Sequence, residues 1–183
     1  MDEIVFDSVE VFTTGAVGRP GQRTFYLQVR DGDRVASVRC EKQQAAAIAQ
    51  YLRRALAHLP IVEGTMVRRP MSLVEPVDEE FVLGSVGLEF MKTLDQFTLV
   101  LRDIESSMAD EQGDGDDDES DDDIDDDVDA STVEGTALRL TISRAQALAF
   151  CDHTDRVVAA GRPDCEYCGR PVDTDGHFCV RMN

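Results

Sequence analysis

The sequence predicts an α+β fold made of a duplicated unit, in which antiparallel strands precede a helix. Three observations predict it: segments rich in branched and aromatic residues, two stretches whose apolar residues recur every three or four positions, and a similar order of these elements in both halves. A length of 183 residues suits one compact domain with a small appendage.

The first half is expected to form a strand, a loop and a hairpin. Strand-like segments, rich in branched or aromatic residues, occupy residues 4–12, 24–30 and 34–39. Residues 14–21 are rich in turn-forming residues and are expected to be a loop. The pair Asp31-Gly32 predicts a tight hairpin turn, because both residue types tolerate a positive φ.

A helix is predicted to follow from Glu41. Apolar residues recur at the helical spacing at Ile48, Leu52, Leu56 and Leu59. Pro60 then helps to end the helix, because proline lacks the N–H that a helix interior uses. We expect this apolar stripe to pack on the sheet.

The second half repeats the pattern. Strands are predicted over residues 81–88, from Phe90 onward, and over residues 97–104 and 136–142. Ser143 and Gln146 then have the spacing of a capping box, in which the serine oxygen accepts from a helix amide and the glutamine reaches back. This helix is expected to run towards Gly161. Residues 41–47 resemble residues 143–149, which supports the duplicated unit.

A long acidic segment interrupts the second half. Over residues 110–129, 14 of 20 residues are Asp or Glu, and they contribute −14 of the net charge of −19. Low apolar content with high charge predicts disorder, because little apolar burial offsets the ordering entropy. Ion binding and nucleic-acid mimicry are alternatives. Asp110 and Asp114 resemble the start of a calcium loop, although Asp121 stands where a bidentate Glu belongs.

The C-terminal tail carries four candidate metal ligands: Cys165, Cys168, His177 and Cys179. The first two form a Cys-x2-Cys turn, which supplies two thiolates from one tight loop, and Gly169 lets backbone amides point at sulfur. The turn at Asp175-Gly176 returns the chain, so that the second pair can reach the same ion. Four thiolate or imidazole ligands leave no open position, which predicts a small knuckle around a structural zinc ion.

Alternatives to zinc are a redox dithiol at Cys165 and Cys168, or four unconnected residues. Cys151 and His153 are a second, weaker pair. They lie two positions apart on the predicted helix, so their side chains point about 200° apart. We expect a core thiol and a partly exposed imidazole there, although His153 could replace one of the four ligands.

Two weaker patterns point to other ligands. Glycines recur every third residue, at Gly15, Gly18 and Gly21. A phosphate loop would place its last glycine at a helix N-terminus, whereas a strand is predicted here, so a glycine-shaped loop is favoured. Arginines gather around the predicted zinc site, at Arg162, Arg170 and Arg181. Nucleic-acid binding is nevertheless not expected, because the chain remains mildly acidic even without the acidic segment.

These patterns divide the chain into four parts. Residues 1–108 form the first part of the body, residues 109–133 the insert, residues 134–161 the final strand and helix, and residues 162–183 the zinc-binding tail. No stretch approaches the ~20 apolar residues of a membrane helix, and a secretory signal is not expected. Cysteines crowded into one tail favour metal binding in a reducing cytoplasm over disulfides.

Several stretches resemble an actinobacterial, ParJ-like family of uncharacterised proteins: residues 15–28, 41–44, 75–76 and 160–181. The likeness covers nearly the whole chain outside the acidic insert. It implies a metal-ligand pattern at the same four tail residues and a ParA-type chromosome-partitioning ATPase as a partner. It implies no established activity.

We therefore expect a non-enzymatic cytoplasmic adaptor or regulator, whose body and zinc tail present a partner-binding surface. One alternative is an enzyme of unrecognised type that uses the loop from Gly15 to Gly21. Another is a nucleic-acid-associated zinc protein that uses the tail arginines. An exposed apolar patch near the tail would favour the adaptor, and a polar pocket beside Gly18 would favour the enzyme.

Overall fold

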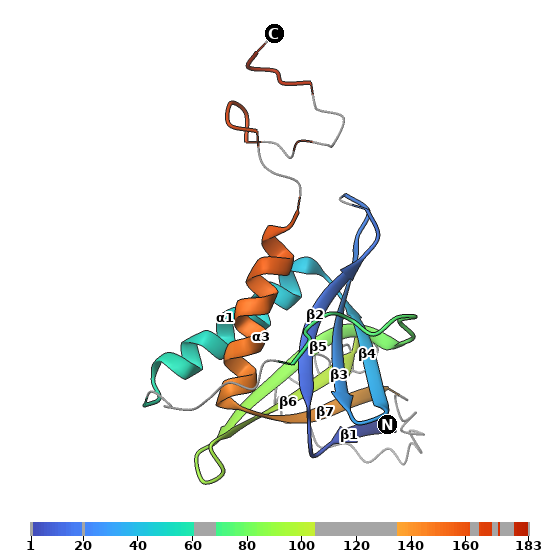
Figure 1. The fold of residues 1–183 in the computed structure, drawn as a ribbon, viewed down its shortest axis with the longest axis vertical. Helices are drawn as coiled ribbons and strands as arrows, with labels where there is room; N and C mark the ends of the chain where they lie inside the picture. Colours follow the sequence, from blue (N-terminus) through green and yellow to red (C-terminus); the bar gives the residue numbers. More distant parts are fainter. Residues whose placement is uncertain are drawn as a thin grey trace, which may run out of the picture.

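In the part of the chain that the structure describes, two helices pack on one side of a curved, seven-stranded sheet (Figure 1). The structure is a computed structural model, and it describes residues 2–19, 21–60, 69–104, 135–161, 165–169, 172 and 178–182. The α+β class predicted from the sequence is confirmed. Among the described residues, no helix has the length and apolar character that crossing a membrane requires.

The strands lie in the sheet in the order β1-β7-β6-β5-β4-β3-β2. Their bounds are β1 (Asp2–Phe6), β2 (Val11–Val17), β3 (Thr24–Asp31), β4 (Arg34–Cys40), β5 (Glu79–Met91), β6 (Gln96–Asp103) and β7 (Thr136–Ser143). The helices are α1 (Lys42–Ala57) and α3 (Arg144–Ala159). Pairing is antiparallel within each half, as predicted, but β1 with β7 and β4 with β5 pair in parallel, so the whole sheet is mixed.

Each half begins with a bent segment that pairs with strands of both halves. In the first half this segment is β1 followed by β2, and in the second half it is β5. In the second half, β5 pairs with β4 up to Val82 and with β6 from Leu83 onward, with a register shift before Ser85. In the first half, β1 pairs with β7 and β2 pairs with β3, and residues 7–10 form the bend between them. Because β1 and β2 stand at opposite ends of the strand order, this bend curls the sheet round its core.

The hairpins that follow these bent strands have matching registers. Phe25 of β3 lies opposite Cys40 of β4, and Phe97 of β6 lies opposite Ile142 of β7. The hairpin turn predicted in the first half is present, with Gly32 at a φ of 57°, but its two central residues are Gly32 and Asp33, because Asp31 pairs with Arg34. Glycine is suited to this position because an L side chain rarely adopts that φ.

The second hairpin is closed at the base of the acidic insert. Its strands end at Asp103 and resume at Thr136, and the Oδ2 atom of Asp103 accepts a hydrogen bond from the backbone N–H of Thr136 at 2.8 Å. Residues 105–134 lie outside the described residues. The disorder predicted for the insert therefore stays a prediction.

Apolar side chains from both halves fill one core. Every second residue of β6 is buried, including Phe97, Leu99 and Leu101, which is the period of a strand with one face against a core. Ile48 of α1 and Phe150 of α3 enter the same cluster. Full burial of such a side chain contributes about 1.5–3 kcal/mol. Ile48 and Leu52 of the α1 stripe are buried in this core, and Leu56 and Leu59 are partly buried against it, so the stripe faces the core of the body.

A glutamine in the first turn of each helix ties that helix to a bend of the sheet. The Oε1 atoms of Gln44 and Gln146 each accept a hydrogen bond from the backbone N–H of the N-cap residue, at 2.8 Å. The amide of Gln44 also donates to the carbonyl of Leu83 at 3.1 Å, and that of Gln146 donates to the carbonyl of Val9. The capping box predicted at Ser143 is confirmed.

Three expectations about strand limits were wrong. Residues 4–12 do not form one strand, because the chain bends at residues 7–10 so that β1 pairs with β7 and β2 pairs with β3. Residues 14–17 belong to β2 rather than to a loop, because Gly15 pairs with β3 and leaves room for Leu73, whose Cγ would lie 2.2 Å from a Cβ at that position. The backbone turns only at Gly18, with a φ of 107°. The two strands predicted on either side of Glu89 are one strand, β5, because Glu89 keeps its place in the pairing with β6.

Candidate metal centre

The predicted metal ligands belong to a tail that follows α3. Figure 1 shows the described tail residues apart from the sheet, past the end of this helix. Three of the four predicted ligands are described: Cys165, Cys168 and Cys179. His177 lies outside the described residues, so the structure does not test it.

The first two cysteines lie in one tight turn. The backbone N–H of Gly169 donates to the carbonyl of Cys165 at 2.8 Å, and Gly169 has a φ of 68°. Hydrogen bonds from the backbone N–H groups of Cys168 and Tyr167 lower the pKa of the Cys165 thiol. A Cβ at Gly169 would meet no atom within 4 Å, so glycine is needed there for its backbone angle and not for space.

The third cysteine begins a second turn that faces the first. The backbone N–H of Met182 donates to the carbonyl of Cys179 at 3.1 Å. Between them, Arg181 reaches across, and its Nη1 donates to the carbonyl of Tyr167 at 2.9 Å. This contact holds the two turns together. Sequence reasoning assigned Arg181 to an arginine cluster and missed its role, because the contact joins residues 14 positions apart.

The three sulfur atoms have the separations of ligands to one ion. The Sγ atoms of Cys165 and Cys179 lie 3.8 Å apart, and all three Sγ atoms lie within 4.8 Å of one another. Tetrahedral zinc with Zn–S bonds of about 2.3 Å places its sulfurs about 3.8 Å apart, whereas a disulfide needs about 2.05 Å. These cysteines are free thiols and could bind a metal ion.

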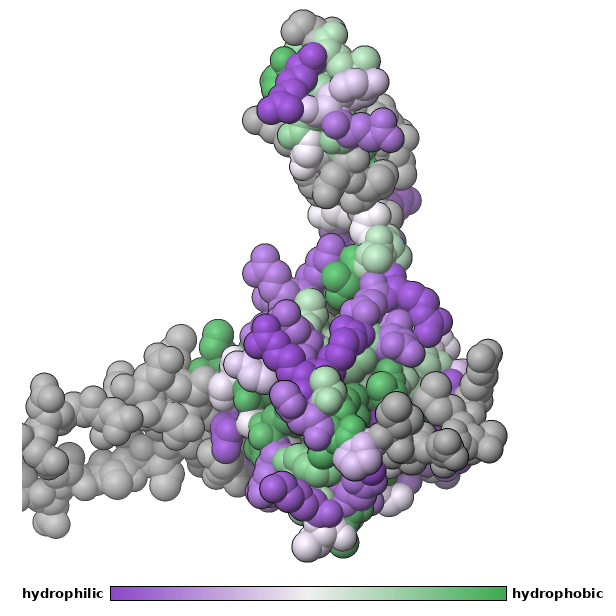
Figure 2. All heavy atoms as spheres, turned by 90° about the vertical axis from the view of Figure 1, so that its left-hand side faces the viewer, coloured by the Kyte–Doolittle hydropathy of each residue, from purple (hydrophilic) through white to green (hydrophobic). Residues whose placement is uncertain are grey.

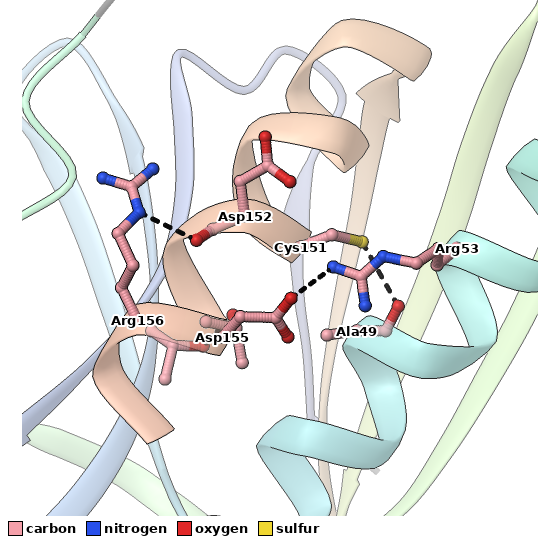
Figure 3. A network of polar contacts seen from close by, with 8 residues as sticks. Ala49, Arg53, Cys151, Asp152, Asp155 and Arg156 are labelled. Atoms are coloured by element: carbon pink, nitrogen blue, oxygen red, sulfur yellow. Dashed lines mark hydrogen bonds and ion pairs between the residues drawn. The ribbon is translucent and has the colours of Figure 1, made fainter. Parts of the chain in front are cut away.

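The cysteines of the body are placed differently from those of the tail. Burial raises the pKa of Cys40 to about 12 and that of Cys151 to about 11, with the charge of Glu41 adding to the first shift. The Sγ of Cys151 donates to the carbonyl of Ala49 at 3.2 Å, across the contact between α3 and α1 (Figure 3). Both are protonated core thiols, so the prediction of a core thiol at Cys151 is confirmed.

His153 is likewise not a metal ligand in this arrangement. Its Nε2 lies 3.0 Å from the carbonyl oxygen of Thr14 in β2, and the ring is partly buried. Burial lowers the pKa of His153, the hydrogen bond to Thr14 raises it, and the charge of Arg156 lowers it further. The ring therefore joins α3 to the sheet, in agreement with the partly exposed imidazole that was expected.

Apolar side chains are exposed on the described part of the tail. More than half of the surface of each is accessible: Tyr167 54%, Phe178 72%, Val180 55% and Met182 63%. Figure 2 shows apolar residues at the surface of this lobe. A sequence pattern could not reveal this, because the same four side chains would suit a small core.

In comparison with known proteins, the chain matches the model of an uncharacterised family. The model of the family described as "Protein of unknown function (DUF3090)" matches residues 4–179, which include both halves of the body and all four predicted metal ligands. No curated protein and no solved structure shows a significant match.

Proposed function

We propose that this chain, which belongs to the DUF3090 family of proteins of unknown function, is a non-enzymatic cytoplasmic adaptor or regulator whose tail is folded by a structural zinc ion. The three clustered thiols of the tail carry this proposal. Soft thiolate ligands favour zinc, copper(I) or iron–sulfur clusters among the metals available to proteins. With His177 as the fourth ligand, the set is three sulfurs and one nitrogen, which is typical of structural zinc.

The tail needs the metal because it has little core of its own. Of its apolar side chains that the structure describes, Phe178, Val180 and Met182 are mostly exposed. Cys179 is the buried residue of the second turn. Zinc binding supplies on the order of 10 kcal/mol in small sites of this kind, which is enough to order a short segment.

The exposed apolar side chains support the adaptor over the enzyme. Tyr167 and Phe178 present aromatic rings of the kind that anchor protein interfaces. Of the described residues, Gly18 lines neither the cavity between α1 and β5 nor the depression beside α3, whereas an enzyme that uses the loop from Gly15 to Gly21 would need a pocket beside Gly18. The guanidinium of Arg181 donates a hydrogen bond to the carbonyl of Tyr167, which does not favour a nucleic-acid surface. Arg162 and Arg170 lie outside the described residues.

The partner that the sequence resemblance implies is a ParA-type partitioning ATPase. We propose that the zinc tail and its apolar side chains contact such a protein. We also propose that the body arose by duplication. The strands β3 and β6 support this, because both contain Phe-x-Leu-x-x-Arg-Asp, at residues 25–31 and 97–103, and both have the same pairing register.

The first experiment measures metal content. We expect about one zinc per chain in protein purified under reducing conditions without added metal. Cys168→Ser should abolish zinc retention and make the tail sensitive to protease, whereas Cys151→Ser, a matched change in the body, should leave zinc content unchanged. Substoichiometric zinc in the wild type, or full tail protection in Cys168→Ser, would contradict the zinc proposal.

The second experiment measures partner binding by interferometry with a purified ParA-type ATPase. The double variant Phe178→Ala/Met182→Ala should bind at least tenfold more weakly than the wild type, with unchanged zinc content. Leu94→Ala is the control, because Leu94 is equally exposed, at 62%, on the turn between β5 and β6. Absence of binding by the wild type would reject this partner and leave the zinc site standing.

A further inference from the structure

The two halves of the body place equivalent residues in equivalent surroundings. Gln44 and Gln146 occupy the same position in their helices, and their amides donate to the carbonyls of Leu83 and Val9. Leu83 and Val9 are themselves equivalent, because each lies two residues before the residue that pairs with the arginine of the next strand. The same alignment sets Ile48 of α1 against Phe150 of α3. Each half therefore serves as a reference for what fills the space between helix and strand in the other.

Between α3 and β2 this space is filled by two stacked rings. The centroids of Phe12 and Phe150 lie 4.3 Å apart with an interplanar angle of 8°, and both residues are buried. The Oγ1 of Thr154 donates to the Oγ1 of Thr14 at 3.1 Å, and the carbonyl of Thr14 contacts His153. These contacts hold α3 against the strand.

Between α1 and β5 the equivalent space is a cavity of about 370 Å³. Val86 stands where β2 has Phe12, and Ile48 stands where α3 has Phe150, so both rings are replaced by smaller side chains. Val86 is 37% exposed and Tyr51, at the position of His153, is 63% exposed. Leu88 replaces Thr14, so the cavity wall is apolar where the other half has hydrogen bonds.

We propose that this cavity binds a small, uncharged molecule that contains an aromatic ring. The ring would take the place that the stacked phenylalanines occupy in the other half. The volume of the cavity lies at the lower end of the usual range for small-molecule sites, about 300–1,000 Å³. The proposal does not depend on the zinc tail or on the adaptor function.

The polar groups of the cavity explain why the ligand is uncharged. The side-chain oxygen of Gln44 accepts from the backbone of Glu41, and its side-chain nitrogen donates to the carbonyl of Leu83, so this amide is already bonded. Among the residues that the structure describes, no charged side chain lines the cavity. A charged ligand would therefore lose its hydration without a partner of opposite charge. The phenol of Tyr51 can bond a polar substituent on the solvent side.

Indole is a suitable probe because it is flat, aromatic and uncharged. In a titration of the full chain followed by methyl NMR, we expect saturable shifts of the Ile48, Val86 and Leu88 methyl signals. Val86→Phe restores the bulk found at Phe12 and should weaken indole binding at least tenfold. Val35→Phe is the matched control, since Val35 is a similarly exposed strand valine, at 41%, and does not line the cavity.

Ile48→Phe provides a second test if Val86→Phe does not fold, because it fills the cavity from the helix side. Absence of saturable shifts up to the solubility of indole would overturn the proposal. Equal indole affinity in the wild type and both filled variants would also overturn it. So would a concentration-dependent dimer in which the same methyl groups become protected and indole cannot compete, since a second copy would then occupy the cavity.

Discussion

The helices α1 and α3 begin in the same way but contact the sheet differently. Each starts with a capping box, and the glutamine of each box reaches a bend in the first strand of the opposite half. Beyond that first turn, α3 contacts β2 through two stacked phenylalanine rings and a hydrogen bond between two threonines. A cavity separates α1 from β5 at the equivalent place. The backbone plan is shared, and the volume of a few side chains decides whether the space is filled.

The difference extends to the surroundings of the two helices. Beside α3, near the bend between β1 and β2, a wider depression of about 870 Å³ carries charged groups, including Glu10, Arg69 and Asp152. Glu10 and Arg69 form an ion pair at 3.0 Å. The cavity beside α1 has no charged residue among the described residues that line it. The depression beside α3 is therefore lined by charged groups, whereas the described lining of the cavity beside α1 is mostly apolar.

The largest expected effect breaks the filled side of this comparison. Phe12→Ala should destabilise the protein by about 3–5 kcal/mol, because it removes a buried ring and leaves a cavity beside Phe150. Val86→Ala, at the equivalent position, should cost less than about 1 kcal/mol, because Val86 already borders an open space. Urea unfolding of both variants measures the difference. An equal loss of unfolding free energy in both variants would show that Phe12 and Val86 lie in similar surroundings.

A smaller effect concerns the polar contacts that hold α3. Thr154→Val removes the donor to Thr14 inside the core and should cost about 1–3 kcal/mol. The double variant Thr14→Val/Thr154→Val should cost less than the sum of the two single variants, because no hydroxyl is then left without its partner. The equivalent pair in the other half, Leu88 and Leu52, is apolar. Additive costs in the unfolding measurements would show that the hydroxyls act independently.

A still smaller effect compares the two hairpins. Deleting residues 110–129 shortens the second connection without touching the contact between Asp103 and Thr136. Loop-closure entropy then favours folding by less than about 1 kcal/mol, so the melting temperature should stay nearly constant. Calorimetry decides the question. A fall of more than a few degrees would show that the insert packs on the body or binds an ion that stabilises it.

The smallest effect is a pH dependence at His153. Burial lowers the pKa of His153 below its unfolded value of about 6.5. The contribution of the neutral ring is therefore complete above about pH 6.5 and is lost as the pH falls towards the folded pKa. His153→Gln should remove this pH dependence, because a glutamine amide does not titrate in this range. The amide can still donate to the carbonyl of Thr14. Unfolding free energies at pH 7.5 and 5.5 test it, and identical pH profiles for both proteins would contradict it.

Local signals in the sequence predicted the elements of the body well. The hairpin turn at Gly32 and the capping box at Ser143 depend on a few neighbouring residues, and both are present. The limits of β2 were predicted less well. Gly15 reads as part of a turn, but its small size makes room for Leu73, which is 58 residues away in sequence. A contact of this kind leaves no local pattern.

The tail shows the same division between spacing and contact. The spacing of Cys165, Cys168 and Cys179 indicated a shared ion, and the structure brings their sulfurs together. The contact between Arg181 and Tyr167 could not be predicted, because an arginine can bond any carbonyl within its reach. Exposure of Phe178 depends equally on what packs around it.

By itself, the sequence determined the α+β class, the order of strands and helices, the turn and cap residues, and the grouping of cysteines. These follow from periodicity and from short-range backbone preferences, which act within a few residues. Only the tertiary structure decided that the bent strands join the halves in parallel and that Phe12 meets Phe150 while Val86 and Ile48 leave a cavity. The reason is that the volume of a core side chain matters through its packing against segments that are distant in the sequence, and a local sequence pattern does not show which segments these are.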